Sequence, residues 1–271
     1  MAIVTISRGT FTGGKALAER LAERLGYPCL GREEIVPQAV ERYGLTEKDL
    51  TDAMNEAPSF WQRLPGRRIS YLKCFTSVLL EHVESGNLVY HGHVGHLALG
   101  EISHVMRVRV IADAEYRIAA TMKRKNLTRD EAVAFVTRID QQRERWTRFL
   151  YGVAWQDASL YDVLFNLSRV SVEGACETII RMTELPDFQP TPQSVAALED
   201  LTLASRVWAA LAAHEETRSA QVTVTSHAGC VTIAGGAGSQ KVIRAISAVA
   251  RKVAGVQEIR SEVGVGRDWY W

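Results

Sequence analysis

The stretch SRGTFTGGKALAERLAERLG, residues 7–26, decides how the N-terminal part of this chain folds. It follows AIVTIS (2–7), an apolar run rich in β-branched residues that is typical of a buried strand. After the glycines, alanine and leucine recur at helical spacing as far as Gly26, a residue suited to end a helix. A strand, a glycine-rich turn and a helix in this order predict the start of an α/β unit.

The turn matches the spacing G-x-x-x-x-G-K of a phosphate-binding loop. Glycines let successive backbone N–H groups converge on phosphate oxygens, the next helix presents its positive end, and the lysine adds a point charge. A plain strand-to-helix turn with a surface lysine is the alternative, but the flanking strand and helix favour phosphate binding. The residues predicted to bind phosphate are Gly9, Thr10, Thr12, Gly13, Gly14, Lys15 and Ala16.

Position 16 departs from this motif, because a serine or threonine normally follows the lysine and reaches a magnesium ion. In this chain Ala16 follows, and Leu17 lacks a hydroxyl as well. Thr10 and Thr12 lie inside the loop and could replace that ligand only in a different geometry. The phosphates, water and an acidic side chain could still hold Mg²⁺. The sequence therefore supports nucleotide binding more firmly than turnover.

Length and composition indicate an ordinary globular protein. The 271 residues suffice for one medium domain plus a small one, and 46% hydrophobic and 23% charged residues fit that class. Thirty-two basic residues face thirty-one acidic ones, so charge predicts binding neither to nucleic acid nor to a membrane surface. The four cysteines are far apart, no leader precedes the first strand, and no apolar run is long enough to span a bilayer. We expect a cytoplasmic protein without disulfides.

Strands and helices alternate along residues 1–185, the predicted first domain. Strands separated by helices predict a parallel sheet covered on both faces. Further strands are predicted at 87–92, 104–112 and 161–166. Helices are predicted over 32–85, with breaks at Pro37, Pro58 and 64–68, then after a cap at Asp113, after the capping box TRDE (128–131) and after Ser171.

A proline-rich segment separates this domain from a second one. PDFQPTPQS (186–194) holds three of the seven prolines, and residues 186–195 are predicted to form a linker. The pattern then changes to that of a small α+β domain over 196–266, with paired antiparallel strands and an aromatic tail at 267–271. Its predicted elements are a helix at about 197–214, strands at 220–227 and 230–235, a helix at about 239–253 and a strand at 257–265.

A strongly basic segment lies between Arg117 and Arg148. It holds nine Lys or Arg residues against four Asp or Glu residues. In a phosphotransferase such a segment closes over the nucleotide, and its arginines neutralise the migrating phosphoryl group. A solvated helix face is the alternative, which the spacing does not exclude. The candidate catalytic residues are Lys15, Arg117, Arg124, Arg143 and Arg145.

Two widely separated motifs resemble one family over about residues 2–184. IVTISRGTFTGGKALAERLAERLGYP (3–28) is similar to the opening of cytidylate-kinase-like P-loop kinases, and residues 138–175 repeat their order D-x-x-R, W-x-D, Y-D and N-x-S-R. The resemblance implies a nucleoside-monophosphate-kinase-like parallel sheet flanked by helices. It also implies phosphoryl transfer from ATP, with Mg²⁺, to a nucleotide such as CMP. By the same resemblance Asp140, Arg143 and Asp157 lie in or beside the lid.

The turn after the strand at 87–92 departs from this family. The family usually has a G-R-G-like turn whose arginine reaches the acceptor nucleotide, whereas this chain reads HGHVGH (91–96), with His93 at the arginine position. An imidazole holds a phosphate less firmly than a guanidinium fork does. The acceptor candidates are Arg67, Arg68 and His93.

The segment from about residue 196 to residue 266 resembles a BON domain, on the pattern VTVTSHAGCVTIAGGAGSQKVIRAISAVARKVAGVQEIRSEVGV (222–265). Eight Lys or Arg residues face seven Asp or Glu residues across 196–271, so no basic face for anionic lipid is evident. The resemblance leaves three roles open for this domain: docking a protein partner, binding a small ligand, or pairing subunits.

Three functions remain open at this point. The leading one is an ATP-dependent nucleoside monophosphate kinase with a BON module for regulation or assembly. The alternative is a nucleotide-binding sensor or scaffold, which the missing hydroxyl at Ala16 favours. The third is a metal-binding protein built on His91, His93 and His96, for which no carboxylate or cysteine partner of suitable spacing follows.

Overall fold

The computed structural model describes residues 2–48, 65–92, 95–100 and 102–266, and gives the backbone alone for residues 65–70 and 150. Of the sequence predictions, Pro58, His93 and the tail at 267–271 lie outside the described residues. The chain forms two compact units, which are described separately. The first contains residues 2–33 and 86–191, and the second contains residues 34–48, 65–85 and 192–266 of the described chain.

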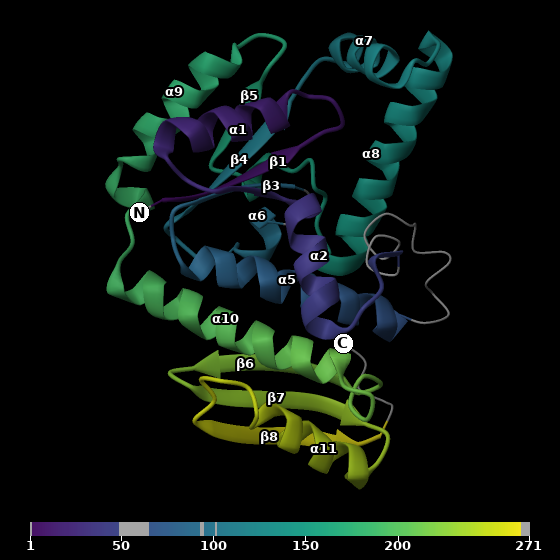
Figure 1. The fold of residues 1–271 in the computed structure, drawn as a ribbon, viewed down its shortest axis with the longest axis vertical. Helices are drawn as coiled ribbons and strands as arrows, with labels where there is room; N and C mark the ends of the chain where they lie inside the picture. Colours follow the sequence, from purple (N-terminus) through teal and green to yellow (C-terminus); the bar gives the residue numbers. More distant parts are fainter. Residues whose placement is uncertain (1, 49–64, 93–94, 101, 267–271) are drawn as a thin grey trace. The chain divides into compact units, whose positions relative to one another are not determined.

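The first unit is built on a five-stranded sheet in the order β2-β3-β1-β4-β5 (Figure 1). Every neighbouring pair of these strands is parallel, which confirms the predicted sheet. The short strand β2 was not predicted, because three residues are too few to show a hydrophobic pattern. The strands are β1 (Ile3–Arg8), β2 (Cys29–Gly31), β3 (Leu88–His91), β4 (Val105–Ile111) and β5 (Val163–Asn166).

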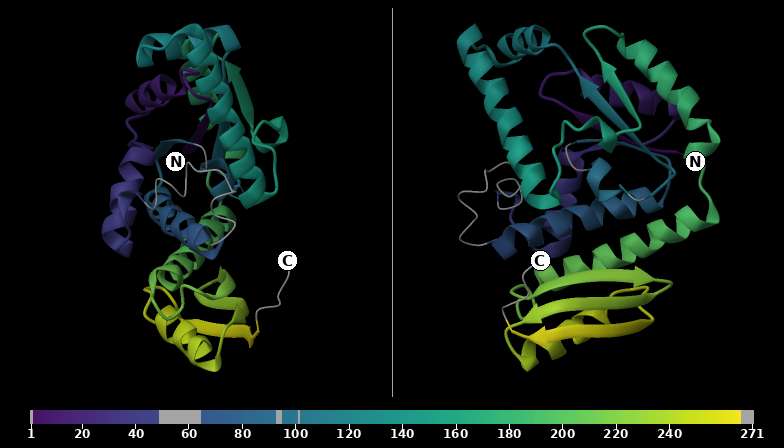
Figure 2. Two further views of the ribbon diagram at one scale, coloured as in Figure 1. Left: turned by 90° about the vertical axis from the view of Figure 1, so that its right-hand side faces the viewer. Right: turned by 180° about the vertical axis from the view of Figure 1, so that it is seen from behind.

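Helices α1 (Gly14–Leu25) and α9 (Val172–Thr183) cover one face of this sheet, as Figures 1 and 2 show. Their apolar side chains form one buried cluster with alternate residues of the strands, among them Val4 and Ile6 of β1. The short helix α6 (Gly95–Ala98) packs on the other face, beside Thr5 and Tyr90. The sheet is therefore apolar toward α1, while its face toward α6 carries polar side chains.

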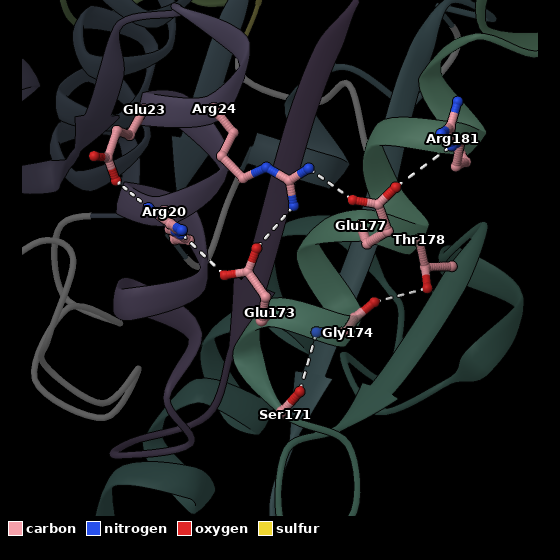
Figure 3. Close-up of polar contacts among 9 residues, drawn as sticks. All are labelled: Arg20, Glu23, Arg24, Ser171, Glu173, Gly174, Glu177, Thr178 and Arg181. Atoms are coloured by element: carbon pink, nitrogen blue, oxygen red, sulfur yellow. Dashed lines mark hydrogen bonds and ion pairs between the residues drawn. The ribbon is translucent and has the colours of Figure 1, made fainter.

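Ion pairs join α1 to α9 on their exposed sides (Figure 3). Arg24 lies between two carboxylates, with Nη1 2.9 Å from Glu173 and Nη2 2.6 Å from Glu177, and Arg20 Nε is 3.0 Å from Glu173. Ser171 begins α9 as predicted, because its hydroxyl accepts a hydrogen bond from the Gly174 amide. These contacts hold α9 against the helix that follows the glycine turn.

Helices α7 (Ala114–Lys125) and α8 (Arg129–Tyr151) form the predicted basic helical pair. Thr128 and Glu131 form the predicted capping box at the start of α8. Asp113 precedes α7 as predicted, but its carboxylate does not cap the helix and accepts a hydrogen bond from Asn166 Nδ2 at 3.0 Å instead.

The second unit combines helices from two distant parts of the sequence. Helix α2 (Arg32–Tyr43) enters it from the first unit, and α5 (Pro65–Glu84) follows. A break was predicted at Pro37, yet α2 continues through it, because Ile35, Val36 and Ala39 are buried and packing compensates for one missing hydrogen bond. The segment 64–68, also predicted as a break, is where α5 begins, since proline fits the first helical position.

A three-stranded sheet with two helices on one face completes this unit. The pairing of β6 (Gln221–His227) with β7 (Cys230–Ala237) is antiparallel as predicted. The pairing of β7 with β8 (Glu258–Val265) is parallel, because helix α11 (Gln240–Ala250) crosses between them. Gly235 in β7 has no room for a side chain, because φ is 132° and a Cβ atom would lie 2.2 Å from the Gln221 carbonyl oxygen.

Helix α10 (Pro192–Ala213) is buried on two faces. It begins within the segment predicted as a linker, and the preceding turn at Pro186–Phe188 is helical too. One buried stripe faces the sheet and consists of Leu203, Ala204, Val207 and Leu211. The other stripe contacts α5 through Ala209, whose carbonyl lies 4.0 Å from Cys74 Sγ, and consists of Ser194, Leu198, Thr202, Ser205 and Ala209.

Charged side chains line the edge of this helix pair. Arg206 of α10 bonds to Glu81 and Glu84 of α5, and Lys73 Nζ lies 3.5 Å from the centroid of the Trp208 ring.

All four cysteines are free, and Cys74 and Cys176 are buried. In the part of the chain that the structure covers, no helix is long and apolar enough to cross a membrane.

Candidate functional site

The glycine turn between β1 and α1 presents unbonded amides. Gly13 adopts φ 86°, a left-handed conformation that favours glycine, and a Cβ atom on Gly14 would lie 2.7 Å from Arg8 Cβ. Within the described contacts, no backbone N–H group from Thr10 to Ala16 donates to a protein acceptor, whereas Leu17 N–H donates to the Gly13 carbonyl at 3.1 Å. Converging free amides at the start of a 12-residue helix form an anion-binding site.

Lys15 stands at the first turn of α1 and is exposed. Its ammonium lies 3.6 Å from Glu19 one turn further on, with 59% of its side chain accessible, so this weak pair leaves it available to a phosphate. Ala16 beside it is exposed as well. The lysine and the amides together fit an oligophosphate.

The hydroxyls of the turn differ in their bonding. Thr12 Oγ1 donates to the Gly9 carbonyl at 3.1 Å, which commits it to the loop. Thr10 Oγ1 is buried and has no hydrogen-bond partner among the described residues. In the described chain no group of three or more His, Cys, Asp or Glu side chains could hold a metal ion. The residues fit a triphosphate tail, and they fit Mg²⁺ only where phosphates and water supply most of its ligands.

Arg117 of α7 ties the lid to the glycine turn. Its Nε donates to the Thr10 carbonyl at 3.0 Å, and its two terminal nitrogens bond to the two oxygens of Asp140 at 2.7 and 2.8 Å. A bidentate arginine–carboxylate pair is rigid and strong. The structure therefore brings together Arg117, Asp140 and the turn, in an arrangement that positions the Thr10 peptide.

Arg143 of α8 reaches the same edge of the sheet without a carboxylate partner among the described residues. Its Nη1 donates to the Arg8 carbonyl at 3.1 Å, and its guanidinium carbon lies 5.9 Å from the centroid of the Trp155 ring. Burial lowers the pKa of Arg143 to about 10. The nearby charge of Asp140 opposes this effect, whereas the positive charges of Arg8, Arg109 and Arg117 act in the same direction as burial. Such a guanidinium is stabilised by an anion.

Arg109 of β4 was not singled out from the sequence. It is 5% exposed, and its Nη1 donates to Ser7 Oγ at 3.0 Å. Its guanidinium carbon lies 3.6 Å from the centroid of the Trp155 ring, a cation–π contact. Burial lowers its pKa, and no carboxylate bonds to it among the described residues. The only sequence signal was an arginine at an inward-facing position of a buried strand, where unpaired charge is rare.

Tyr161 organises the hydrogen bonds around Arg109. Its hydroxyl donates to the Trp155 carbonyl at 2.7 Å, so it must accept from Ser7 Oγ at 3.2 Å and from His96 Nε2 at 3.1 Å. His96 therefore carries its proton on Nε2, and its buried Nδ1 has no partner among the described residues. The serine hydroxyl accepts from Arg109 and donates to Tyr161, which fixes the direction of the whole chain of bonds.

Arg8 extends the cluster toward β3. Its side chain lies under Gly14, and its Nη2 is 3.4 Å from His91 Nδ1, which acts as the acceptor. Burial lowers the pKa of Arg8, while the nearby charge of Glu33 opposes this effect. Of the three histidines considered as metal ligands, His91 and His96 are thus engaged by Arg8 and Tyr161.

The other candidates are exposed, begin a turn, or have side chains outside the description. Arg124 is exposed, and its guanidinium carbon lies 5.5 Å from the ring centroid of Phe11, a residue of the glycine turn, whereas Arg145 is exposed on α8. Asp157 begins a short helical turn, where its carboxylate accepts from the Ser159 amide. Arg67 and Arg68 lie in α5, but their side chains are outside the description.

The balance of charge in this cluster is positive. Four guanidinium groups, those of Arg8, Arg109, Arg117 and Arg143, surround the glycine turn and the adjoining sheet edge. Among the described residues, Asp140 is the one carboxylate that hydrogen-bonds to any of them, and Arg117 occupies both of its oxygens. The arrangement can therefore bind polyanions and stabilise charge on a transferring group.

Comparison with known proteins agrees with this geometry. The model of the cytidylate kinase-like family matches residues 3–169, and that of the BON domain matches residues 199–267. The cytidylate kinase of Ignicoccus hospitalis is 24% identical over 184 residues, which cover 67% of this chain and 99% of that protein. The cytidylate kinase of Archaeoglobus fulgidus is 24% identical over 186 residues, covering 67% and 94%.

A solved structure supports the fold. The crystal structure of an uncharacterized protein from Eubacterium ventriosum aligns with 68% of this chain and 99% of its own, at a TM-score of 0.50 and 19% sequence identity. The similarities of both parts of the chain confirm the two resemblances found in the sequence.

Proposed function

The chain belongs to the cytidylate kinase-like family, and from this premise we propose that it transfers the terminal phosphoryl group of ATP to a nucleoside monophosphate. One observation supports this most: unbonded amides of the glycine turn lie next to guanidinium groups that lack a carboxylate partner among the described residues. Such a site is short of negative charge, which a triphosphate and a second phosphate would supply.

The donor phosphates would lie on the amides from Thr10 to Ala16, with Lys15 on the outer phosphates. Bound Mg²⁺ would neutralise charge on the transferring phosphates, and Ala16 leaves this role to phosphate and water ligands rather than to a side-chain hydroxyl. Arg117 and Asp140 hold the Thr10 peptide in place, and Arg143 stabilises the transferring group. The acceptor atom is already a phosphate oxygen, so the reaction needs no strong general base.

The test is a coupled assay of ADP release across the common nucleoside monophosphates, with Lys15→Ala beside the unaltered protein. We expect ADP release with at least one of them and a loss of about 100-fold or more in the variant, because the charge on the outer phosphates is removed. Lys123→Ala, on the exposed side of α7, serves as the matched control and should behave like the unaltered protein. ATP binding by calorimetry without ADP release above the level of Lys15→Ala would contradict the enzyme.

A nucleotide-binding sensor is the second candidate. Ala16 favours it, and so does the bond from Thr12 to the Gly9 carbonyl, because both leave magnesium without the usual hydroxyl ligand. In that case nucleotides bind, no monophosphate is converted, and the BON domain signals the bound state to a partner. In either case we propose that the BON domain has a role in regulation or assembly. Measuring the binding of a partner or ligand to the full chain would test this role.

A further inference from the structure

Two arginines on the same face of β4 have opposite surroundings. Arg107 is neutralised, because its Nε lies 3.3 Å from Asp162 Oδ2 and its Nη1 donates to the Gly100 carbonyl at 2.6 Å. Arg109, two residues further along, donates to Ser7 and lies on the face of Trp155, and no carboxylate among the described residues hydrogen-bonds to it. The charge of Asp140 acts on Arg109 from nearby, but both oxygens of Asp140 are bonded to Arg117. A buried guanidinium without a directly bonded counter-ion is costly, which points to an anion that the chain itself does not supply.

A second guanidinium without a hydrogen-bonded carboxylate among the described residues lies at the same aromatic ring. The guanidinium carbon atoms of Arg109 and Arg143 lie 3.6 and 5.9 Å from the centroid of the Trp155 ring. The positive charge of Arg109 lowers the pKa of Arg143, and Asp140, whose charge acts on both, is bonded through both oxygens to Arg117, so a further anion would stabilise the pair. A phosphate dianion, with three acceptor oxygens, is the group that two guanidinium forks satisfy best.

The surroundings of Arg109 hold it in one orientation. Ser7 Oγ can accept from Arg109 because its own proton goes to Tyr161, whose proton goes to the Trp155 carbonyl. His96 closes this network through its Nε2–H. The arginine is therefore preorganised, which is what a specific binding residue requires.

The position of Arg109 separates it from the donor site. Its partner Ser7 faces α6, whereas the neighbouring Ile6 packs in the cluster with α1. The donor phosphates belong to the turn at the start of α1. Helix α6 begins at Gly95, and the sequence before it has His93 in place of the arginine that the family uses for the acceptor. The face of the sheet toward α6 carries another guanidinium, that of Arg109, which can supply the charge that the sequence lacks at position 93.

We propose that Arg109 and Arg143 jointly bind the phosphate of the acceptor nucleotide, and that Arg109 replaces the arginine missing at position 93. This proposal rests on the proposed phosphoryl transfer, and it names a binding residue for that reaction. Trp155 provides the apolar surface that orients both guanidinium planes, and Ser7, Tyr161 and His96 position Arg109 without touching the ligand.

The experiment titrates CMP, ATP and inorganic phosphate into the full chain and into Arg109→Gln by calorimetry. Glutamine keeps a donor toward Ser7 but removes the charge. We expect affinity for CMP and phosphate to fall about tenfold or more, and affinity for ATP to change less than about threefold. Arg109→Lys should restore part of the affinity, because an ammonium keeps the charge without the fork. Arg107→Gln is the matched control on the same strand and should bind CMP like the unaltered protein.

The proposal is overturned if folded Arg109→Gln binds CMP and phosphate as tightly as the unaltered protein does. Circular dichroism checks that both proteins are folded. If Arg109→Gln does not fold, Arg143→Gln is tested in its place. It must show the same loss of affinity for CMP with little change in affinity for ATP. If the unaltered protein binds no nucleoside monophosphate, the proposed kinase fails, and phosphate alone then decides: loss of phosphate binding in Arg109→Gln supports the anion site, and retention refutes it.

Discussion

His96 shows how burial determines the chemistry of a single residue. Its ring is 2% exposed, stacks on Tyr161 and faces the guanidinium groups of Arg107 and Arg109. Burial lowers its pKa to about 3, and the two positive charges act in the same direction. The ring is therefore neutral at physiological pH.

Acid should destabilise the protein partly through His96. An unfolded histidine has a pKa of about 6.5, so between about pH 6.5 and pH 3 the unfolded state binds the extra proton and the free energy of unfolding falls as the pH falls. The expected slope from this one group approaches about 1.4 kcal/mol per pH unit. Urea denaturation of His96→Gln from about pH 7 to about pH 5 should show a shallower loss than the unaltered protein. Equal slopes would contradict the buried, neutral ring.

The buried arginines show that the density of charge along the sequence identifies only some of the residues in the cluster. The basic segment between Arg117 and Arg148 was predicted from its density of charge, and it does contribute Arg117 and Arg143 to the cluster. Arg124 and Arg145, from the same segment, are exposed. Arg109 lies outside the segment, on a strand, and only the contacts of its side chain reveal it.

At the scale of elements, local signals placed most helix ends correctly. The capping box at Thr128 begins α8, and Gly26 and Gly152 end α1 and α8. Short-range hydrogen bonds favour the helix ends at these positions. The break predicted at Pro37 was wrong, because tertiary packing there outweighs the local preference of proline. In the segment predicted as a linker, Pro186 and Pro192 stand at the starts of helical segments, a position that proline favours. Strand β2 exists only because β3 pairs with it.

The cap of α9 offers a test at this scale. Ser171→Ala removes the hydroxyl that accepts from the Gly174 amide, and we expect a loss of about 1 kcal/mol in the free energy of unfolding. Thr178→Ala, on the same helix, is the control, because alanine favours a helix interior and the change should be neutral or slightly stabilising. Chemical denaturation measures both, and equal losses in the two variants would refute the capping role.

At the scale of the whole molecule, the second unit joins helices that the sequence separates. Helices α2 and α5 lie between β2 and β3 in the chain, inside the part that matches the cytidylate kinase-like family, yet they belong to the same compact unit as the BON domain. Helix α5 packs on α10, and α2 bonds to α5. The second buried stripe of α10, through Ala209, would face water if α5 were absent. The BON domain therefore shares a buried interface with α5 and is not an independently packed domain.

The reactivity of the Cys74 thiol tests the packing of α5 on α10. Burial raises its pKa to about 12, so its thiol should resist alkylation in the folded full chain. A variant that ends at Thr191 lacks α10, and we expect its Cys74 to be alkylated about tenfold faster or more, with loss of cooperative unfolding. A variant ending at Gly266 is the control. Site-resolved mass spectrometry measures the modification, and equal protection in both variants would show that α5 does not depend on α10.

The sequence by itself indicated the parallel sheet, the glycine turn, most helix caps and both family resemblances, because each leaves a local pattern: alternating strand and helix segments, glycine spacing, capping residues and family motifs. Only the tertiary structure decided that Arg109 lies beside Arg143 and Trp155, that Asp140 serves Arg117, and that α5 packs on α10. These pairs are far apart in sequence, and the choice among possible partners for a buried charge or an apolar face is made by packing, which no local pattern records.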